Sequence, residues 1–356
     1  MESWRVIDTG LRPPAQNIAL NRALLEARAA EEIPSTLRFL RFTASALLGY
    51  HQSAEQELDL DYCRAHGVAV QRRITGGGAI YFDETQIGWE LYLHQRDVGT
   101  RDMQAISKRI CHAAATAVSA LGIDARYRPR NDIEVDGRKL CGTGGFFDGD
   151  TLFYQGTLLI DCDPAEMVAA LNVPAAKLAK RGLDSVTQRV VTLKELLGPR
   201  LPPPAEIVEA LLGGLAEGLG LDPEWATPSP GEEALAKRLH DDEIGTDAFV
   251  FEIDDPGRDR SLLTATHAAP GGQITAYLRV EGGKGALRVR EALITGDFFA
   301  APPRIVFDLE AVFRGVPVNR IGHAVEGFFA ATRAEVLSVT PDDFRATLEQ
   351  AAGGAR

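Results

Sequence analysis

The chain has 356 residues, which exceeds the roughly 250 to 300 residues at which a single hydrophobic core stops growing, so we expect two domains. Hydrophobic residues make up 45% and charged residues 25% of the sequence, a composition typical of a globular protein that excludes wholesale disorder. The 38 basic and 50 acidic residues give a net charge of −12, which disfavours a nucleic-acid partner because phosphate would be repelled.

Two further classes are disfavoured by what the sequence lacks. It opens without a basic leader followed by an apolar core, and no run approaches the ~18 to 20 continuous apolar residues of a membrane span. We therefore expect a cytoplasmic protein with no membrane partner. The four cysteines contain no CxxC pair, which argues against a disulfide framework or a structural zinc site.

The first half of the chain predicts helices alternating with strands. Apolar residues at helical spacing predict a helix over 17–30 with Asn17 as its N-cap, and LRFLRFTASALLGY predicts strands. A second helix is expected over 54–66, and VAVQRRI then predicts a strand that ends at three glycines before AIYF resumes the β pattern. A long helix is expected over 103–121. The segments IDARY, DIEVDGRKLCG and LFYQGTLLID predict strands joined by Asp-Gly turns.

The second half predicts helices followed by a smaller domain. The proline-rich segment Pro199–Pro204 looks like a border, but the helical patterns after it complete the first core, so we place the border at Asp241. Beyond it, FVFEIDD, QITAYLRVEGG and ALRVREALITGDFF alternate as strands, while IVFDLEAVFRG and DDFRATLEQA have helical spacing. The prediction is an α+β protein with a large mixed-sheet domain over 1–241 and a small α+β domain over 242–356.

The segment RRITGGGAIY at 72–81 is the most informative for chemistry. Glycines let a backbone approach a ligand closely and point N–H groups at an anion, and Arg72 and Arg73 add permanently charged donors suited to phosphate or carboxylate. For the triplet alone, a glycine-rich turn beside two solvated arginines is an equally good interpretation. Ala79 and Ile80 follow the glycines where a Walker P-loop needs Lys and Ser/Thr, so a P-loop ATPase is disfavoured.

A second candidate segment runs from Asn131 to Gly142. Asp132 offers oxygen ligands to a magnesium ion, and Lys139 offers a charge that neutralises a reacting phosphate, although alone the segment also suits a charged hairpin. Cys141 lies two residues after Lys139, so on a regular strand both side chains share a face. We interpret Cys141 as a small buried filler rather than a nucleophile.

In order along the chain, RRITGGGAIYFD, RNDI followed by GRKLCG, and YQGTLLID followed by RGLDSVTQRVVTLKELL resemble the motifs of the lipoate-protein ligase A family. NIALNRALLEA resembles that family's first helix, and ITGDFF followed by LEAVFRGV resembles its C-terminal accessory domain. The resemblance implies a mixed-sheet catalytic fold shared with biotin ligases and related to class II aminoacyl-tRNA synthetases. It also implies that 1–241 is the catalytic domain and 242–356 the accessory domain.

The resemblance also assigns roles to residues. It implies that Lys139 is catalytic and bridges the acyl carbonyl and the α-phosphate. It implies that Gly78, Ile80 and Tyr81 meet the adenylate, while Asn131 and Asp132 face phosphate and Asp132 binds magnesium. The residues implied to line the acyl pocket are Arg73, Thr75, Gly76, Gly77, Gly78, Lys139 and Gly156.

The sequence departs from the family's pattern at four places. Phe82 stands where the family usually has His, Pro129 where it has Gly, and Cys141 where it has Ser. The family also has a His near the position of Tyr154 and Gln155. These departures bear on the substrate that the chain prefers.

The implied reaction joins lipoate or octanoate to a protein lysine at the expense of ATP, with Mg²⁺ as cofactor. The acid first forms an acyl-adenylate, and a lysine then attacks it on a carrier, namely a lipoyl domain of a 2-oxo acid dehydrogenase complex, a glycine-cleavage H protein or a related lipoate-binding protein. Two alternatives stay open: an ATP-independent octanoyl or lipoyl transferase that uses Cys141, and a protein that binds lipoate or its adenylate without turnover. Biotin ligation is disfavoured because the GRGRxGR-like loop of that family is absent.

Overall fold

A computed structural model describes residues 3–129, 131–172, 189–269, 271–283, 286–332, 335–336 and 339–354. The chain divides into two compact units. The first unit comprises Met1–Leu47, Leu58–Arg72 and Ile80–Val250. The second comprises Leu48–Glu57, Arg73–Ala79 and Phe251–Arg356. The second unit therefore includes two short segments from early in the sequence. The domain border at Asp241 stays a prediction.

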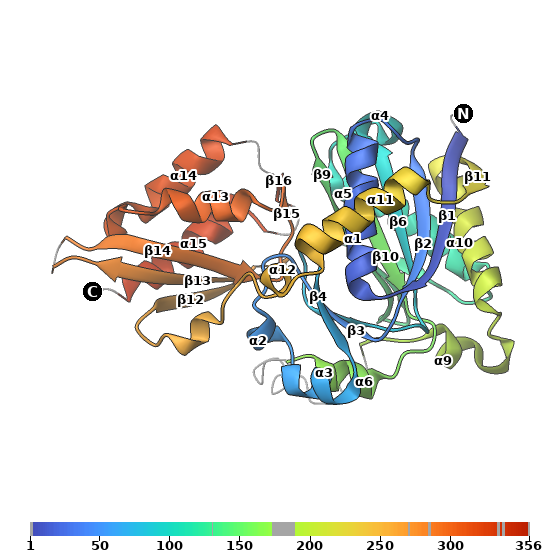
Figure 1. Cartoon of the computed structure of the whole chain (residues 1–356), viewed down its shortest axis with the longest axis horizontal. Coiled ribbons are helices and arrows are strands. Elements are labelled where there is room, and N and C mark those ends of the chain that lie inside the picture. Colours follow the sequence, from blue (N-terminus) through green and yellow to red (C-terminus); the bar gives the residue numbers. More distant parts are fainter. Residues whose placement is uncertain are drawn as a thin grey trace. The chain divides into compact units, whose positions relative to one another are not determined.

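An eight-stranded mixed sheet forms the centre of the first unit, with the order β11-β1-β2-β6-β10-β9-β8-β7 (Figure 1). Strand β1 pairs in parallel with β11 and β2, and the other neighbours are antiparallel. The expected α+β class with a large mixed sheet is confirmed. The strands are β1 (Ser3–Arg12), β2 (Thr36–Phe42), β6 (Ile87–His94), β7 (Arg126–Arg128), β8 (Asp132–Val135), β9 (Arg138–Asp148), β10 (Thr151–Leu158) and β11 (Asp222–Ala226).

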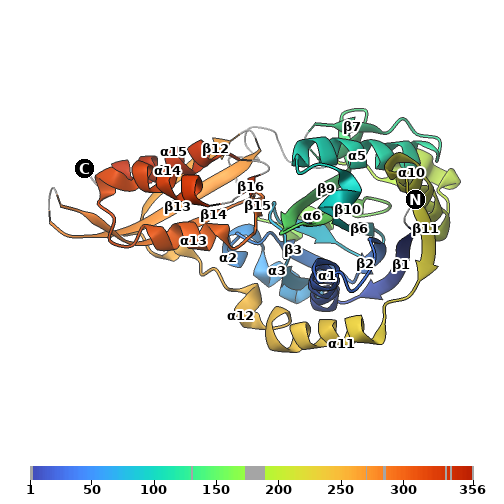
Figure 2. The same ribbon diagram turned by 90° about the horizontal axis from the view of Figure 1, so that it is seen from above.

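Helices cover both faces of this sheet, with α1 and α11 on one face and α5 and α10 on the other (Figure 2). These helices are α1 (Pro14–Ala29), α5 (Met103–Ser119), α10 (Pro204–Leu219) and α11 (Pro230–Leu239). Shorter helices are α3 (Leu60–His66), α4 (Gln95–Val98), α6 (Pro164–Ala170), α9 (Leu193–Leu197), α12 (Asp247–Val250), the 3₁₀ turn Gly198–Arg200 and the π turn His240–Ile244. A small sheet, β4-β3-β5, is built from β3 (Ser45–Leu48), β4 (Ala69–Arg72) and β5 (Ile80–Phe82).

The first helix begins earlier than predicted, and the expected role of Asn17 as its N-cap is wrong. Helix α1 begins at Pro14, because proline at the first helical position has no N–H that needs a partner. Asn17 lies inside the helix and is fully buried, where its side chain donates to the Arg41 carbonyl at 2.9 Å and accepts from Arg38 at 2.5 Å. It belongs to a buried polar network.

Two other predictions are wrong, one because of a neighbouring side chain and one because of a residue distant in the sequence. The helix expected over 54–66 is interrupted, because the side chain of Asp59 accepts from the N–H of Tyr62 at 2.8 Å and begins α3 anew. The strand expected at FVFEIDD is wrong, since its first residues end helix α12. The buried guanidinium of Arg72 donates to the carbonyls of Phe249 and Val250 at 3.0 and 2.8 Å and satisfies the end of that helix.

The second unit packs helices on an antiparallel sheet of order β12-β13-β14 (Figure 1). Its core contains Ile274, Leu278, Phe298, Phe313 and Phe344. Strands β13 and β14 and the helices at 305–312 and 341–353 match the predicted ones, whereas β12, β15, β16 and the helix at 321–331 were not predicted. Two glycines in that helix lower its helix propensity. The elements are α2 (Ala54–Glu57), β12 (Leu263–Ala269), β13 (Gly272–Glu281), β14 (Arg288–Gly296), β15 (Ala300–Ala301), α13 (Ile305–Val312), α14 (Ile321–Ala331), β16 (Glu335–Val336), α15 (Pro341–Gly353) and the 3₁₀ turns Pro256–Arg258 and Val318–Arg320.

A buried carboxyl makes the stability of the second unit depend on pH. Burial and the neighbouring Glu252 raise the pKa of Glu310 to about 8 from an ordinary 4.5, against a hydrogen bond from the Ile294 N–H at 2.6 Å. The folded state thus favours the protonated form, so this contribution to stability is present below pH 4.5 and is lost as the pH rises through about 8.

We expect Glu310→Gln to remove this loss, because the amide oxygen still accepts from Ile294 and does not ionise. We expect thermal unfolding measured between pH 4.5 and about 8 to show that the variant is increasingly more stable than the wild type as the pH rises. A constant difference between the two proteins at every pH would contradict the assignment.

No helix in the described parts of the chain is both long enough and apolar enough to cross a bilayer. The four cysteines are buried free thiols.

Candidate active site

An irregular hairpin of β8 and β9 builds the charged centre of the first unit. Asp136 and Gly137 both have positive φ, 51° and 78°, as a two-residue type I′ turn requires, which confirms the predicted Asp-Gly turn. The register then shifts: Glu134 pairs with Lys139, whereas Ile133 pairs with Cys141. One extra residue of β9 is therefore accommodated in a β-bulge.

The bulge overturns the expectation that Lys139 and Cys141 share a face. Directly paired residues point to the same side of a sheet, and successive residues point to opposite sides, so Lys139 follows Glu134 while Cys141 follows Ile133. Burial agrees: the Lys139 side chain is 37% exposed, whereas Cys141 is 1% exposed.

Asp132 holds two cations at once. One of its carboxylate oxygens accepts from Lys139 Nζ at 2.8 Å, and the other accepts from Arg128 Nη2 at 2.6 Å. Arg128 also lies 3.3 Å from Glu134. Burial opposes ionisation of Asp132, but the charges and hydrogen bonds of Lys139 and Arg128 outweigh it and lower its pKa. The result is a half-buried, partly neutralised cluster with a lysine at its exposed edge.

Lys139 reaches Asp132 by lying over Gly142. A Cβ on Gly142 would sit 2.6 Å from both Cε and Nζ of Lys139, so a larger residue would displace the ammonium. Gly142 pairs with Asp132 on the neighbouring strand, and this places the three residues on one face. The sequence does not single out Gly142 or Arg128, because their importance depends on strand register.

The register extends this face into a row of small residues. Gly142 pairs with Thr157, and Thr157 pairs with Gly88, so the row crosses β9, β10 and β6. Neighbouring strands lie about 4.8 Å apart, so the row spans roughly 10 Å from the residue under Lys139. At its far end, Leu40 and Phe82 lie over Gly88, where a Cβ on this glycine would sit 2.9 Å from Leu40 and 3.4 Å from Phe82.

A buried network fixes the start of β8. The side chain of Asn131 donates to the Thr143 carbonyl, and Thr143 Oγ1 donates to the Asn131 carbonyl at 2.8 Å. Thr143 Oγ1 also lies 2.6 Å from the Tyr154 hydroxyl, which contacts Ser107 of α5 at 2.8 Å. Asn131 therefore anchors the strand that carries Asp132.

Cys141 and Gly156 lie on the buried face beneath α5. Burial raises the pKa of the Cys141 thiol well above its ordinary value, which keeps it protonated and a poor nucleophile. Gly156 pairs with Trp89, and a Cβ on Gly156 would sit 2.2 Å from the Trp89 ring. The indole thus occupies the space that the missing side chain leaves.

Ile80 and Tyr81 belong to β5 of the first unit, where they pair with Leu47 and Ala46. Tyr81 is buried, and burial together with nearby Asp83 raises the pKa of its hydroxyl. The backbone of Lys139 is tied to the segment after β10, since its N–H donates to Arg189 O at 2.6 Å and its carbonyl accepts from Val191 N at 2.9 Å. Arg189 and Val191 belong to the motif RGLDSVTQRVVTLKELL, whose first part, 181–188, lies outside the described residues.

Residues Thr75–Gly78, which we call the glycine loop, belong to the second unit together with Arg73. The buried Arg73 guanidinium donates to Gly76 O at 3.1 Å and Gly78 O at 2.9 Å, and to Thr75 Oγ1 at 3.3 Å. Burial lowers the pKa of Arg73 to about 10, which leaves it charged at neutral pH. Arg73 therefore holds the loop from inside.

Two of the three glycines are contacted by the chain itself. A Cβ on Gly76 would sit 2.2 Å from Phe298 O, and one on Gly77, whose φ is 92°, would sit 2.8 Å from the Phe299 ring. At Gly78 the nearest atom would be at 3.5 Å, an ordinary contact. Gly78 is thus the member of the triplet at which packing leaves room.

The donor set does not build a metal cage. Among the described residues, no three His, Cys, Asp or Glu side chains gather closely enough to hold an ion. Asp132 offers one carboxylate whose two oxygens already contact Lys139 and Arg128. Magnesium binding by Asp132 stays a prediction, and no step below depends on it.

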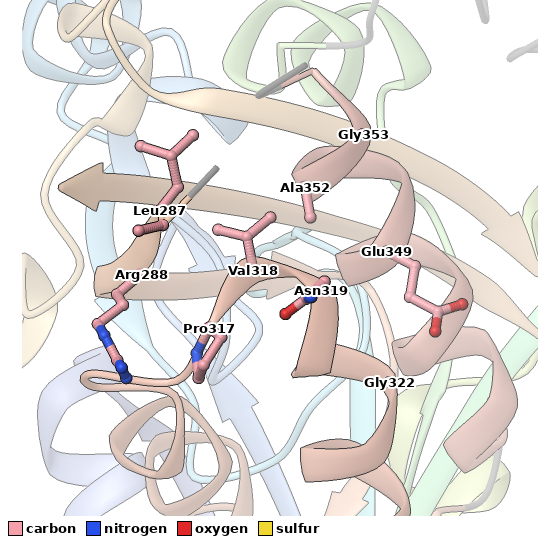
Figure 3. A pocket seen from close by; sticks show the side chains of 10 residues that line it. Leu287, Arg288, Pro317, Val318, Asn319, Gly322, Glu349, Ala352 and Gly353 are labelled. Atoms are coloured by element: carbon pink, nitrogen blue, oxygen red, sulfur yellow. The ribbon is translucent and has the colours of Figure 1, made fainter. Parts of the chain in front are cut away.

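A cavity of about 770 Å³ lies within the second unit (Figure 3). Both polar and apolar side chains line it, and none of the predicted site residues does. The lining residues are Ala286, Leu287, Arg288, Pro317, Val318, Asn319, Gly322, Glu349, Ala352 and Gly353.

Solved structures share this fold. The lipoate-bound LipL1 of P. falciparum aligns with a TM-score of 0.75 over 98% of this chain and 100% of that one, at 16% identity. A bi-partite lipoate protein ligase of Thermoplasma acidophilum aligns with a TM-score of 0.63 over 72% of this chain and 99% of that one, at 24% identity. A lipoate-protein ligase A bound with ATP aligns at 25% identity and a TM-score of 0.60 over 70% of this chain and 99% of that one.

Curated relatives carry two activities in their names. Lipoate-protein ligase A subunit 1 of Thermoplasma acidophilum is 28% identical over 60% of this chain and 83% of its own length. Lipoate-protein ligase LplJ of Bacillus subtilis is 28% identical over 80% of this chain and 82% of its own. Octanoyltransferase LipM of Kyrpidia tusciae is 29% identical over 68% of this chain and 98% of its own.

The family model of the lipoyl protein ligase A/B catalytic domain matches residues 13–216, more than half of the chain. The match includes the whole Lys139–Asp132–Arg128 cluster and the strands that carry it. The resemblance inferred from the motifs is thereby confirmed, and the chain belongs to the lipoyl protein ligase A/B family.

Proposed function

We propose that the chain is an ATP-dependent ligase that activates lipoate or octanoate as an acyl-adenylate and transfers the acyl group to a carrier lysine. The observation that carries this proposal is the ammonium of Lys139, held by Asp132 over a glycine. A half-exposed cation in a fixed position suits a reaction between two anions. The ATP-bound relative of this fold supports nucleotide use.

In the first step, a carboxylate oxygen of the acid attacks the α-phosphorus of ATP, and the bond to pyrophosphate breaks. Bringing two anions together is unfavourable, so a fixed cation at the meeting point lowers the barrier. In the second step, the carrier's lysine amine attacks the acyl carbonyl carbon and loses a proton, and AMP leaves. Lys139 stabilises the charge on the acyl and phosphoryl oxygens in both steps.

The row of small residues supports an acyl substrate. It starts under Lys139 at Gly142, passes Thr157 and ends where Leu40 and Phe82 cover Gly88. Its length of roughly 10 Å is comparable with an extended octanoyl chain. We propose that the acyl chain lies along this row.

The remaining assignments follow from the same proposal. The acid is bound by Arg73, Thr75 and the glycines of the loop. The adenylate is bound by the same residues together with Ile80, Tyr81 and Asn131. Gly156 supports the sheet beneath the acyl chain from its buried face. Residues 242–356 act as an accessory domain in a cytoplasmic enzyme that uses Mg-ATP. The carrier is a lipoyl domain or a related lipoate-binding protein, since the Thermoplasma ligase is described with an E2 lipoyl domain.

A transferase that works through Cys141 is the second candidate, because octanoyltransferases are among the relatives. A cysteine nucleophile must ionise and reach the substrate. Cys141 is buried on the face opposite to Lys139, and its pKa is raised by burial. Both features favour the ligase.

The substitution Cys141→Ser tests this choice. Because the ligase needs no thiol and serine is nearly isosteric, we expect carrier lipoylation with ATP to stay within about threefold of the wild type, since the change removes no transition-state charge. The assay measures lipoyl transfer to a carrier domain, followed by hydroxylamine treatment of the enzyme. A hydroxylamine-labile acyl group on the wild type, formed without ATP and absent from the variant, would establish the transferase instead.

A further inference from the structure

The segment that connects β14 to β15 packs against the glycine loop within the second unit (Figure 1). The Gly77 N–H donates to the Phe298 carbonyl at 2.9 Å. Gly76 approaches the same carbonyl so closely that no side chain fits between them. The Phe299 ring lies so close to Gly77 that a Cβ on this glycine would sit 2.8 Å from it. The loop therefore rests directly on Phe298 and Phe299.

A third segment completes the arrangement. The Tyr50 N–H donates to Thr75 O at 2.9 Å, and the Gly296 N–H donates to His51 O at 3.0 Å. The His51 ring stacks on Phe298 with centroids 5.1 Å apart and planes 17° from parallel. The segment around residue 50 is thus hydrogen-bonded to the loop on one side and to the Phe298 segment on the other.

Phe298 joins this arrangement to the core of the second unit. It is fully buried and meets Phe344 of α15 edge-to-face at 5.2 Å. Protein interiors are close-packed, so a displacement at such a contact is transmitted rather than absorbed. The conformation of the glycine loop is consequently set by residues that come more than 200 positions later in the sequence, as the hydrogen bond between Gly77 and Phe298 shows.

We propose that Phe298 and Phe299 are positioning residues for acid activation, acting through the glycine loop. This inference rests on the proposed function, in which the loop binds the acid and the adenylate. Activation requires two separate substrates to be oriented, whereas transfer starts from acid and nucleotide already joined. A loosened loop therefore impairs activation more than transfer.

The variant Phe299→Ala tests the proposal, because it removes the ring on Gly77 and spares the buried Phe298. We expect kcat/KM for pyrophosphate release from lipoate and ATP to fall about ten- to a hundredfold, the scale of a small misplacement of reacting groups. Carrier acylation from supplied lipoyl-adenylate should fall less than about threefold, and Phe299→Leu should restore most of the activation.

Phe329→Ala is the matched control, since Phe329 is also half-buried in this unit but its ring packs on Phe344 at 5.8 Å. Equal losses in both half-reactions, or a loss in Phe329→Ala as large as that in Phe299→Ala, would overturn the positioning role. Hydrogen exchange of residues 75–78 supplies an activity-independent readout, and we expect it to be faster in Phe299→Ala than in the control. Unchanged exchange overturns the inference, whereas a wild type that forms no adenylate refutes the proposed function.

Discussion

Lys139→Ala is expected to lower the rate of acyl-adenylate formation by about a hundredfold or more, the cost of losing one fixed charge donor at a reacting centre. The ammonium lies over Gly142 and is held at 2.8 Å from Asp132, so the substitution removes a charge that has a fixed position. Folding should be nearly unaffected, because the side chain is partly exposed and Asp132 keeps its contact with Arg128. Pyrophosphate release and thermal unfolding measure the two effects.

Lys194→Ala is the control for this variant. Lys194 also forms a single ion pair, with Asp161 at 2.6 Å, but both side chains are exposed and lie outside the cluster. An exposed pair contributes about 0 to 1 kcal/mol to stability and nothing to the reaction. Wild-type pyrophosphate release by folded Lys139→Ala would remove the basis of the proposed mechanism.

Arg38→Leu is expected to destabilise the first unit by about 3 to 5 kcal/mol, the cost of breaking a buried ion pair from one side. Arg38 has no exposed surface and donates to Glu90 at 3.1 Å, to Asn21 at 2.6 Å and to Asn17 at 2.5 Å. Burial raises the pKa of Glu90 despite the nearby Arg38 charge, so removing that charge leaves the carboxyl with a large desolvation cost.

Tryptophan fluorescence during urea unfolding reports on this unit alone, because Trp4, Trp89 and Trp225 all lie in it. The control is Arg126→Leu, which removes an exposed pair with Asp124 at 2.6 Å and should leave the stability close to that of the wild type. If the two variants unfold at the same urea concentration, the buried network does not stabilise the fold as proposed.

Local sequence patterns were sufficient for much of the fold. The alternation of β13 and β14, the helical spacing of α5 and the turn at Asp136 and Gly137 depend on neighbours in the chain, and the structure confirms them. Predictions failed where distant residues decide. Helix α12 ends at Val250, where Arg72, far away in the sequence, donates hydrogen bonds to the carbonyls of Phe249 and Val250.

In the candidate site, too, local motifs were predictive, whereas features that depend on distant residues were not. Motifs identified Lys139 and Asp132, and the structure brings them into contact. The bulge that turns Cys141 away from Lys139, and the role of Gly142 beneath the lysine, depend on strand register, which the sequence alone does not specify. The glycine triplet was predicted to approach a ligand closely, and this stays a prediction. The structure shows that Gly76 and Gly77 approach the chain's own Phe298 and Phe299.

The most direct test of the central claim is a balance of products in one reaction. Purified protein is incubated with lipoate, ATP and a lipoyl domain, and acylated lysine, AMP and pyrophosphate are quantified together. The account predicts one AMP and one pyrophosphate for each lipoyl group on the carrier lysine, and no acylation when ATP is omitted and an octanoyl thioester is supplied. Acylation from the thioester without ATP, and without AMP formation, would contradict it.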